Sequence, residues 1–137
     1  MENIIKTVIA IGGASASFLW GEWSALLNIL VTFVAIDYVS GLIAAGVDGE
    51  LNSKVGWKGI AKKVAIFLVV AVAHQVDVAL GGALHMFRDA AIFFYLANEL
   101  LSITENAGRI GIPVPERLLS AIEVLRDKGE GKGSENQ

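Results

Sequence analysis

Residues 23–36 read WSALLNILVTFVAI, an apolar run that decides the fold class. A membrane-spanning helix needs about 20 mostly apolar residues to cross a hydrocarbon core about 30 Å thick. The run continues to residue 46 with Asp37 as its only charged residue. A helix of a soluble bundle keeps a polar face, which residues 23–36 do not show. The stretch therefore predicts a transmembrane helix.

The composition of the whole chain agrees with a membrane protein. Of its 137 residues, 54% are hydrophobic and 18% are charged, whereas soluble domains average about 25% charged residues. The net charge of −3 argues against a polyanionic partner, so we expect no nucleic-acid binding. Because the chain has no Cys, it has no disulfide framework, thiolate metal site or cysteine nucleophile.

The charged residues are clustered, and the segments between the clusters approach the length of a span. There are four such segments, at residues 4–20, 23–46, 62–81 and 88–106. Small residues lower the hydrophobicity of the first, and the second half of the last is polar. Tryptophans lie near segment ends, where amphipathic rings prefer the headgroup layer. We expect an all-α integral membrane protein with three to four transmembrane helices.

The first segment has a second interpretation, a secretory signal peptide, because residues 14–16 (Ala-Ser-Ala) resemble a cleavage site. Glu2 offsets Lys6, so no net positive charge precedes the apolar core, and that core is short. We therefore expect residues 4–20 to be a span.

The positions of Lys and Arg predict the orientation, because positive residues are retained on the cytoplasmic side. One basic cluster lies between the second and third segments and consists of Lys54, Lys58, Lys62 and Lys63. A second follows the fourth segment and consists of Arg109, Arg117, Arg126, Lys128 and Lys132. Four spans place both clusters inside with both termini cytoplasmic, whereas three spans would separate them.

The chain divides into a transmembrane domain, residues 1–112, and two short segments that follow it. At residues 113–128 a helix is expected, because apolar residues recur there at amphipathic spacing. This orientation makes that helix cytoplasmic. Residues 129–137 are polar and glycine-rich, which predicts a disordered tail.

Three lysines are spaced four residues apart, at Lys54, Lys58 and Lys62, with Ser53 as the expected N-cap. Such a stripe fits a helix on anionic lipid, where each Lys contributes about 1 kcal/mol. Together with Lys63 the stripe could also serve only to set the topology. The two roles are compatible.

Three acidic residues, Asp37, Asp77 and Glu99, fall inside predicted spans. A lone charge at the centre of a span costs at least about 2.5–3.5 kcal/mol, so these residues should face protein, water or a partner. Polar residues on the same helical faces accompany them: Ser40, His74 and Ser102. Interhelical hydrogen bonds in an oligomer and a proton or ion pathway are both compatible with the pattern, and we favour assembly.

Small residues recur at four-residue spacing, a pattern that lets helices approach closely in lipid. The pairs are Gly12 with Ala16, Gly13 with Ser17, Ser40 with Ala44, and Gly41 with Ala45.

No catalytic motif occurs, so we expect neither an enzyme nor a cofactor. His74 and His85 are eleven residues apart, which is not a common ligand spacing, so the sequence supports no metal site.

Five stretches of the chain, in this order and spacing, resemble the phage-lysis and toxin-secretion holin family, which includes the holin-like proteins of clostridial toxin loci. They are IDYVSGLIAA (36–45), LNSKVGWKGIAKK (51–63), AVAHQVD (71–77), NELLSITEN (98–106) and GIPVPE (111–116). The matching polar positions are Asp37, Lys54, Lys58, Lys62, Lys63, His74, Asp77, Glu99, Ser102, Glu105 and Asn106.

The resemblance implies a small multi-pass protein of the bacterial cytoplasmic membrane that forms homo-oligomers. Such proteins open lesions through which an endolysin, or in some relatives a toxin, passes, and they have no catalytic residues. We hypothesise that Asp37, Asp77 and Glu99 face other helices in the inactive state and line water in the lesion.

Two other functions are compatible with the sequence. The first is a small channel or transporter subunit coupled to ions or protons, with His74, Asp77 and Glu99 as the path. The second is a membrane scaffold whose helix at residues 116–128 docks a soluble partner.

Overall fold

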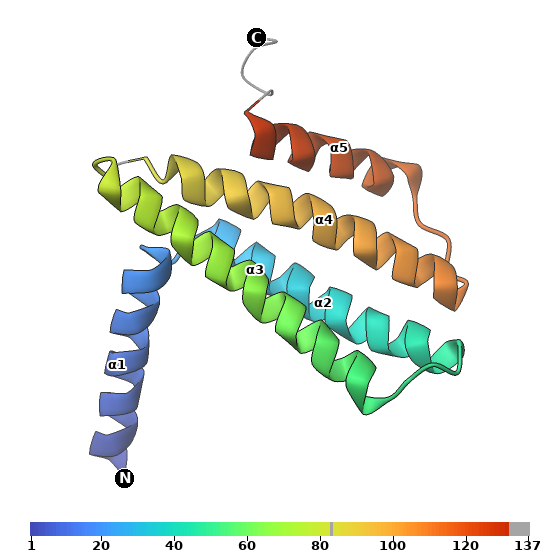
Figure 1. Cartoon of the computed structure of the whole chain (residues 1–137), viewed down its shortest axis with the longest axis horizontal. Coiled ribbons are helices and arrows are strands. Elements are labelled where there is room, and N and C mark those ends of the chain that lie inside the picture. The colour runs from blue at the N-terminus through green and yellow to red at the C-terminus, as the bar shows by residue number, and fades with distance from the viewer. Residues whose placement is uncertain (83, 132–137) are drawn as a thin grey trace.

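A computed structural model of the chain describes residues 1–82 and 84–131 (Figure 1). Over these residues the chain forms five α-helices and no strand, which confirms the predicted all-α fold. The helices are α1 (Glu2–Trp20), α2 (Ala25–Val47), α3 (Ser53–Ala79), α4 (Met86–Ile110) and α5 (Glu116–Glu130).

The starts of α2 and α3 are set by side chains that satisfy free backbone N–H groups. Ser24 caps α2, where its hydroxyl accepts a hydrogen bond from the N–H of Leu27. Asn52 caps α3, where its Oδ1 accepts from the N–H of Val55 at 2.9 Å. The prediction that Ser53 is the N-cap is therefore wrong by one residue, because Ser53 is already helical.

Helices α2, α3 and α4 run side by side, and α5 folds back along the outer side of α4 (Figure 1). Helix α1 diverges from this bundle, has no buried residue, and contacts α3 near its own end. There, the Trp20 indole N–H donates to the carbonyl of Phe67 at 2.8 Å. The Gln75 amide donates to the carbonyl of Phe18 at 2.8 Å.

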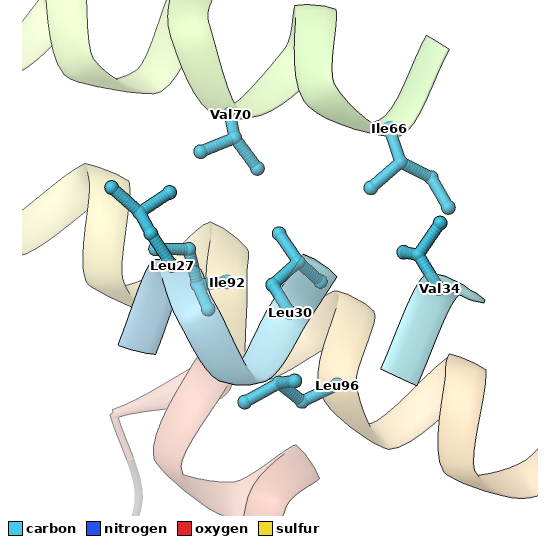
Figure 2. Packing of buried hydrophobic residues seen from close by; sticks show 7 residues of the cluster. All are labelled: Leu27, Leu30, Val34, Ile66, Val70, Ile92 and Leu96. Atoms are coloured by element: carbon cyan, nitrogen blue, oxygen red, sulfur yellow. The ribbon is translucent and has the colours of Figure 1, made fainter. Parts of the chain in front are cut away.

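The main apolar core lies where α2, α3 and α4 meet, and every residue in it comes from one of these helices (Figure 2). Its members are Leu27, Leu30 and Val34 of α2, Ile66 and Val70 of α3, and Ile92 and Leu96 of α4. In lipid, such contacts hold helices together by van der Waals packing, because the surrounding tails are equally apolar.

A smaller core joins α5 to α4, through Ala97 and Leu100 of α4 and Ile122 of α5. Close approach of the two helices requires glycine at position 129. A Cβ there would lie 2.8 Å from the backbone nitrogen of Phe94. Gly129 and Glu130 belong to α5, so the predicted disorder is wrong for these two residues. Residues 132–137 lie outside the described residues.

Within the described chain, three helices are long and apolar enough to cross a membrane, namely α1, α2 and α3. Large apolar side chains on their outer surfaces are exposed, among them Ile11, Ile36 and Leu68, as expected for lipid-facing residues. The fourth predicted span, residues 88–106, lies within α4, which does not reach the same composition. Nevertheless α4 packs beside α2 and α3.

Candidate functional site

A buried ion cluster connects the three bundle helices, and it consists of Asp37 of α2, Lys63 of α3 and Glu99 of α4. The Lys63 Nζ donates to Asp37 Oδ2 and, at 2.6 Å, to Glu99 Oε2. The three side chains are only 6%, 13% and 4% exposed, respectively. The cluster therefore holds all three helices together through one shared cation.

Neighbouring polar groups complete the hydrogen bonding of Asp37. The Asn106 amide donates to Asp37 Oδ1 at 2.9 Å and to Ser40 Oγ at 3.0 Å. The Ser40 hydroxyl in turn donates to the backbone carbonyl of Asp37 at 3.1 Å. Ser102 borders the same pocket as Asp37 and Lys63. A buried charge is tolerated only when it is paired and hydrogen-bonded in this way.

Lys63 belongs to this cluster and not to the basic loop in which the sequence placed it. The loop is short, residues 48–52, because α3 begins at Ser53. Lys54, Lys58 and Lys62 remain an exposed stripe on α3. Each residue of a helix is rotated by about 100° from the previous one, so Lys63 points away from the stripe and into the bundle.

Two glycines of α3 allow α2 to come close beside the ion cluster. The Tyr38 hydroxyl of α2 donates to the carbonyl of Gly56 at 3.3 Å. A Cβ at Gly59 would lie 3.1 Å from a carbon of the Tyr38 ring. The contact of Tyr38 was not predicted from the sequence. The i, i+3 spacing of Gly56 and Gly59 places both glycines on one face of α3 and was the only local sign that another helix comes close there.

A second polar region lies at the other end of the bundle, where Asp77 of α3 caps the start of α4. Its two carboxylate oxygens accept from the backbone N–H groups of Phe87 at 2.8 Å and Arg88 at 2.9 Å. A carboxylate is favourable here because the helix N-terminus carries a partial positive charge. Asp77 therefore fixes the start of α4 to the end of α3.

Arg88 ties the turn between α1 and α2 to this region, a role that sequence reasoning missed. The side chain is 3% exposed, and one guanidinium nitrogen donates to the carbonyls of Trp20 and Glu22, each at 3.0 Å. Its Nε donates to Asp89 at 3.1 Å. The only sign of this role in the sequence was the position of Arg88 as the first residue of a predicted span.

The fold also brings His74 and His85 together beside Asp77. Their rings are stacked, with centroids 5.9 Å apart and planes 28° apart. One ligand atom from each of His74, Asp77 and His85 can be chosen so that all three lie within 4.8 Å of one another. The eleven-residue spacing gave no sign of this, because the turn between α3 and α4 reverses the chain.

The small-residue pairs are divided between the bundle and α1. In α2, Ala45 is buried, and a Cβ at Gly41 would lie 3.5 Å from the Asn106 amide nitrogen. In α1, a Cβ at Gly12 or Gly13 would have no neighbour within 4 Å in the described structure. Ala16 and Ser17 complete these two pairs in the same helix. That another helix packs against α1 through these four residues stays a prediction.

Comparison with known proteins gives one family match and several relatives. Residues 14–127 match the model of the bacteriophage holin family. A probable holin of Bacillus phage phi105 is 36% identical, over 85% of this chain and 84% of its own length. An uncharacterized protein of Halalkalibacterium halodurans is 50% identical, over 92% and 96%. An uncharacterized protein of Clostridium perfringens is 37% identical, over 93% and 99%. No solved structure matches the chain.

Proposed function

Because the chain belongs to the bacteriophage holin family, a family of non-enzymatic membrane proteins, we propose that it forms homo-oligomers in the bacterial cytoplasmic membrane and opens lesions there. The passenger is an endolysin, by analogy with the relative named a probable holin in a Bacillus phage. In a toxin locus the passenger would be a toxin.

The observation that carries this proposal is the ion cluster of Asp37, Lys63 and Glu99 inside an apolar bundle. In the closed bundle each charge has a partner within the same chain. If the helices separate in lipid, the charges lose these partners, and a lone charge costs at least about 2.5–3.5 kcal/mol. The separated helices are therefore stable only where water solvates the charges or another copy of the chain pairs with them. Both conditions are met in an oligomer that surrounds water.

Helix α1 supports self-association. It is apolar enough to span a membrane and buries no residue against the rest of the chain. The faces of Gly12 and Gly13 have no neighbour within 4 Å in the described structure. Small residues at four-residue spacing let helices of neighbouring copies approach closely in lipid.

We propose four spans with both termini cytoplasmic, on the basis of where the basic residues lie. The end of α4 meets the end of α2 through Arg109, which pairs with Asp48 at 2.9 Å. The first turn of α3, with Lys54, follows α2 after only five residues. Lys54 and Arg109, the first residues of the two basic clusters, therefore lie toward the same end of the bundle, whereas α5 carries Arg126 and Lys128 back along α4 toward Phe94. The retention of positive charge in the cytoplasm supports placing the end with Lys54 and Arg109 inside.

The test is expression of the full chain in bacteria together with a cytoplasmic endolysin. We expect growth to continue and then stop abruptly, with early lysis when an energy poison is added. The endolysin expressed alone is the control. If the chain accumulates in the membrane without releasing the enzyme, the proposal is wrong. Saturable, gradient-dependent solute flux would instead support the transporter function.

A second test concerns the lining of the lesion. We expect Asp37→Asn and Glu99→Gln to change the time of lysis, since both remove charge from the ion cluster. Asp77→Asn is the third variant, and it weakens the cap of α4. Unchanged timing in all three variants would refute the role of these acids.

A further inference from the structure

We propose that His74, Asp77 and His85 form a three-ligand site for a transition-metal dication of the zinc type, which joins the end of α3 to the start of α4. His74 and Asp77 lie in the last two turns of α3, and His85 immediately precedes α4. The site lies at the end of the bundle opposite Arg109 and Asp48, away from the ion cluster.

The distances fit a single ion. The chosen ligand atoms of the three residues are at most 4.8 Å apart. Zinc binds nitrogen and carboxylate oxygen at about 2.0–2.2 Å in tetrahedral geometry, so two ligands of one ion are separated by about 3.3–3.6 Å, and the ligand atoms must move closer by about 1–1.5 Å. Small side-chain rotations therefore bring all three atoms into bonding distance.

The two histidines have unused bonding capacity at this place. The Nδ1 atoms of His74 and His85 are buried and have no hydrogen-bond partner among the described residues. His74 itself is only 7% exposed. Buried polar atoms are nearly always hydrogen-bonded, and an ion is one of the few explanations for exceptions. Two such atoms in neighbouring imidazoles beside a carboxylate point to a shared ligand.

The backbone around the histidines is built to hold them together. His85 has a φ of 47°, the only positive φ of a non-glycine residue in the described chain. Such a conformation costs about 1–3 kcal/mol and is concentrated at functional sites. Gly82, with a φ of 73°, closes the turn by donating its N–H to the carbonyl of Asp77 at 2.7 Å. This reversal stacks the ring of His85 on that of His74.

The turn between α1 and α2 covers the site closely. A Cβ at Gly21 would lie 2.6 Å from a carbon of the His74 ring, so only glycine fits there. On the other side, a pocket lined by Asp77, His85 and residues of the turn between α3 and α4 borders the site. The site is therefore covered closely by the α1–α2 turn on one side and bordered by a pocket on the other.

The donor set selects the class of metal. Two imidazoles with one carboxylate suit zinc and its neighbours, and three protein ligands leave a fourth position for water. Each Asp77 oxygen accepts one backbone N–H and keeps a second lone pair for the ion. Arg88 adds a nearby positive charge, which its own ion pair with Asp89 at 3.1 Å offsets.

The binding test uses the purified full chain in detergent micelles, stripped with a chelator and titrated with Zn²⁺ in a calorimeter. We expect one equivalent to bind per chain and to raise the thermal midpoint. His74→Gln and His85→Gln should each weaken binding more than about tenfold, since outer-shell partners of a metal alone change affinity by about 10–100-fold. The exposed Glu123→Gln is the control and should bind as the wild type does.

The inference is overturned if the wild type binds no Zn²⁺ stoichiometrically, or if both histidine variants bind it as tightly as the wild type. A second measurement does not depend on how the variants fold. Co²⁺ bound to the wild type should give the intense visible spectrum of a four- or five-coordinate site, and the weak spectrum of the hydrated ion would refute the site. Neither measurement involves lysis, so the result is independent of the proposed holin function.

Discussion

Replacing Lys63 with Met tests whether the ion cluster holds the closed bundle together. The variant keeps the length and apolar stem of the side chain and removes the cation that Asp37 and Glu99 share. Both carboxylates hydrogen-bond to the same nitrogen, so its loss leaves two buried negative groups facing each other. Removing one partner of a buried ion pair costs about 3–5 kcal/mol, and we expect Lys63→Met to lose at least that much.

The matched control is Lys62→Met, which changes the adjacent but exposed lysine in the same helix. Surface substitutions usually change stability by less than about 0.5 kcal/mol, so the two variants should differ by several kcal/mol. The free energy of unfolding is measured by denaturant titration in detergent micelles. In the same cells used for the lysis test, Lys63→Met should also lyse earlier than Lys62→Met.

A third variant separates charge from packing. The triple change Lys63→Met, Asp37→Asn and Glu99→Gln removes all three charges at nearly constant volume. Replacing a whole buried ion network is often neutral or stabilising, so the triple variant should recover most of the loss. If Lys63→Met is as stable as the control, or if the triple variant is no more stable than the single one, the ion cluster does not hold the bundle.

Three further substitutions test other contacts. Gly129→Ala puts a methyl group 2.8 Å from the backbone of Phe94 and should make α5 more sensitive to limited proteolysis, whereas Gly108→Ala, which meets no atom within 4 Å, should not. Asp77→Ala removes both acceptors that cap α4 and should lower the free energy of unfolding by about 0.5–2 kcal/mol in denaturant titration, and a neutral result would contradict the capping role. Gly21→Ala has a φ of 78° and a methyl group 2.6 Å from an imidazole carbon, so its thermal midpoint should fall; an unchanged midpoint would show that the turn moves freely.

The helices could be predicted from the sequence, and so could the expectation that the acidic residues inside spans do not face lipid. Both follow from local patterns. Hydropathy and length identify a span, and the cost of a charge in lipid requires Asp37 to face something other than lipid. The partner of Asp37 could not be predicted in the same way. Lys63 follows Lys62 in the sequence, and only the rotation of α3 from its start at Ser53 distinguishes the exposed lysine from the buried one.

Contacts that depend on turns were the least predictable. Whether His85 reaches His74 depends on the reversal of the chain at Gly82, where a positive φ is required. Arg88 is only the first residue of a predicted span in the sequence, yet its guanidinium binds carbonyls that lie 66 and 68 residues away. Such pairings are set by how the helices pack, and no spacing rule contains that information.

The position of α5 leads to a final prediction about which surface meets water. Seven of its fifteen residues are charged, yet α5 packs along α4 as far as Phe94. If α4 crosses the membrane beside α2, the outer face of α5 cannot lie against lipid, where each lone charge would cost at least about 2.5–3.5 kcal/mol. The paired α4 and α5 are therefore compatible with a membrane only if the outer face of α5 lies in water.

Cysteine labelling in membranes tests this directly, because the chain has no Cys of its own. Glu123→Cys places a thiol on the exposed face of α5, and Ile122→Cys places one against α4. In inside-out vesicles a membrane-impermeant maleimide should label position 123 and leave position 122 largely unlabelled. Equal labelling of both thiols would mean that α5 leaves α4 in the membrane. If neither thiol is labelled, the charged face of α5 lies away from water, and the prediction based on the cost of burying these charges is wrong.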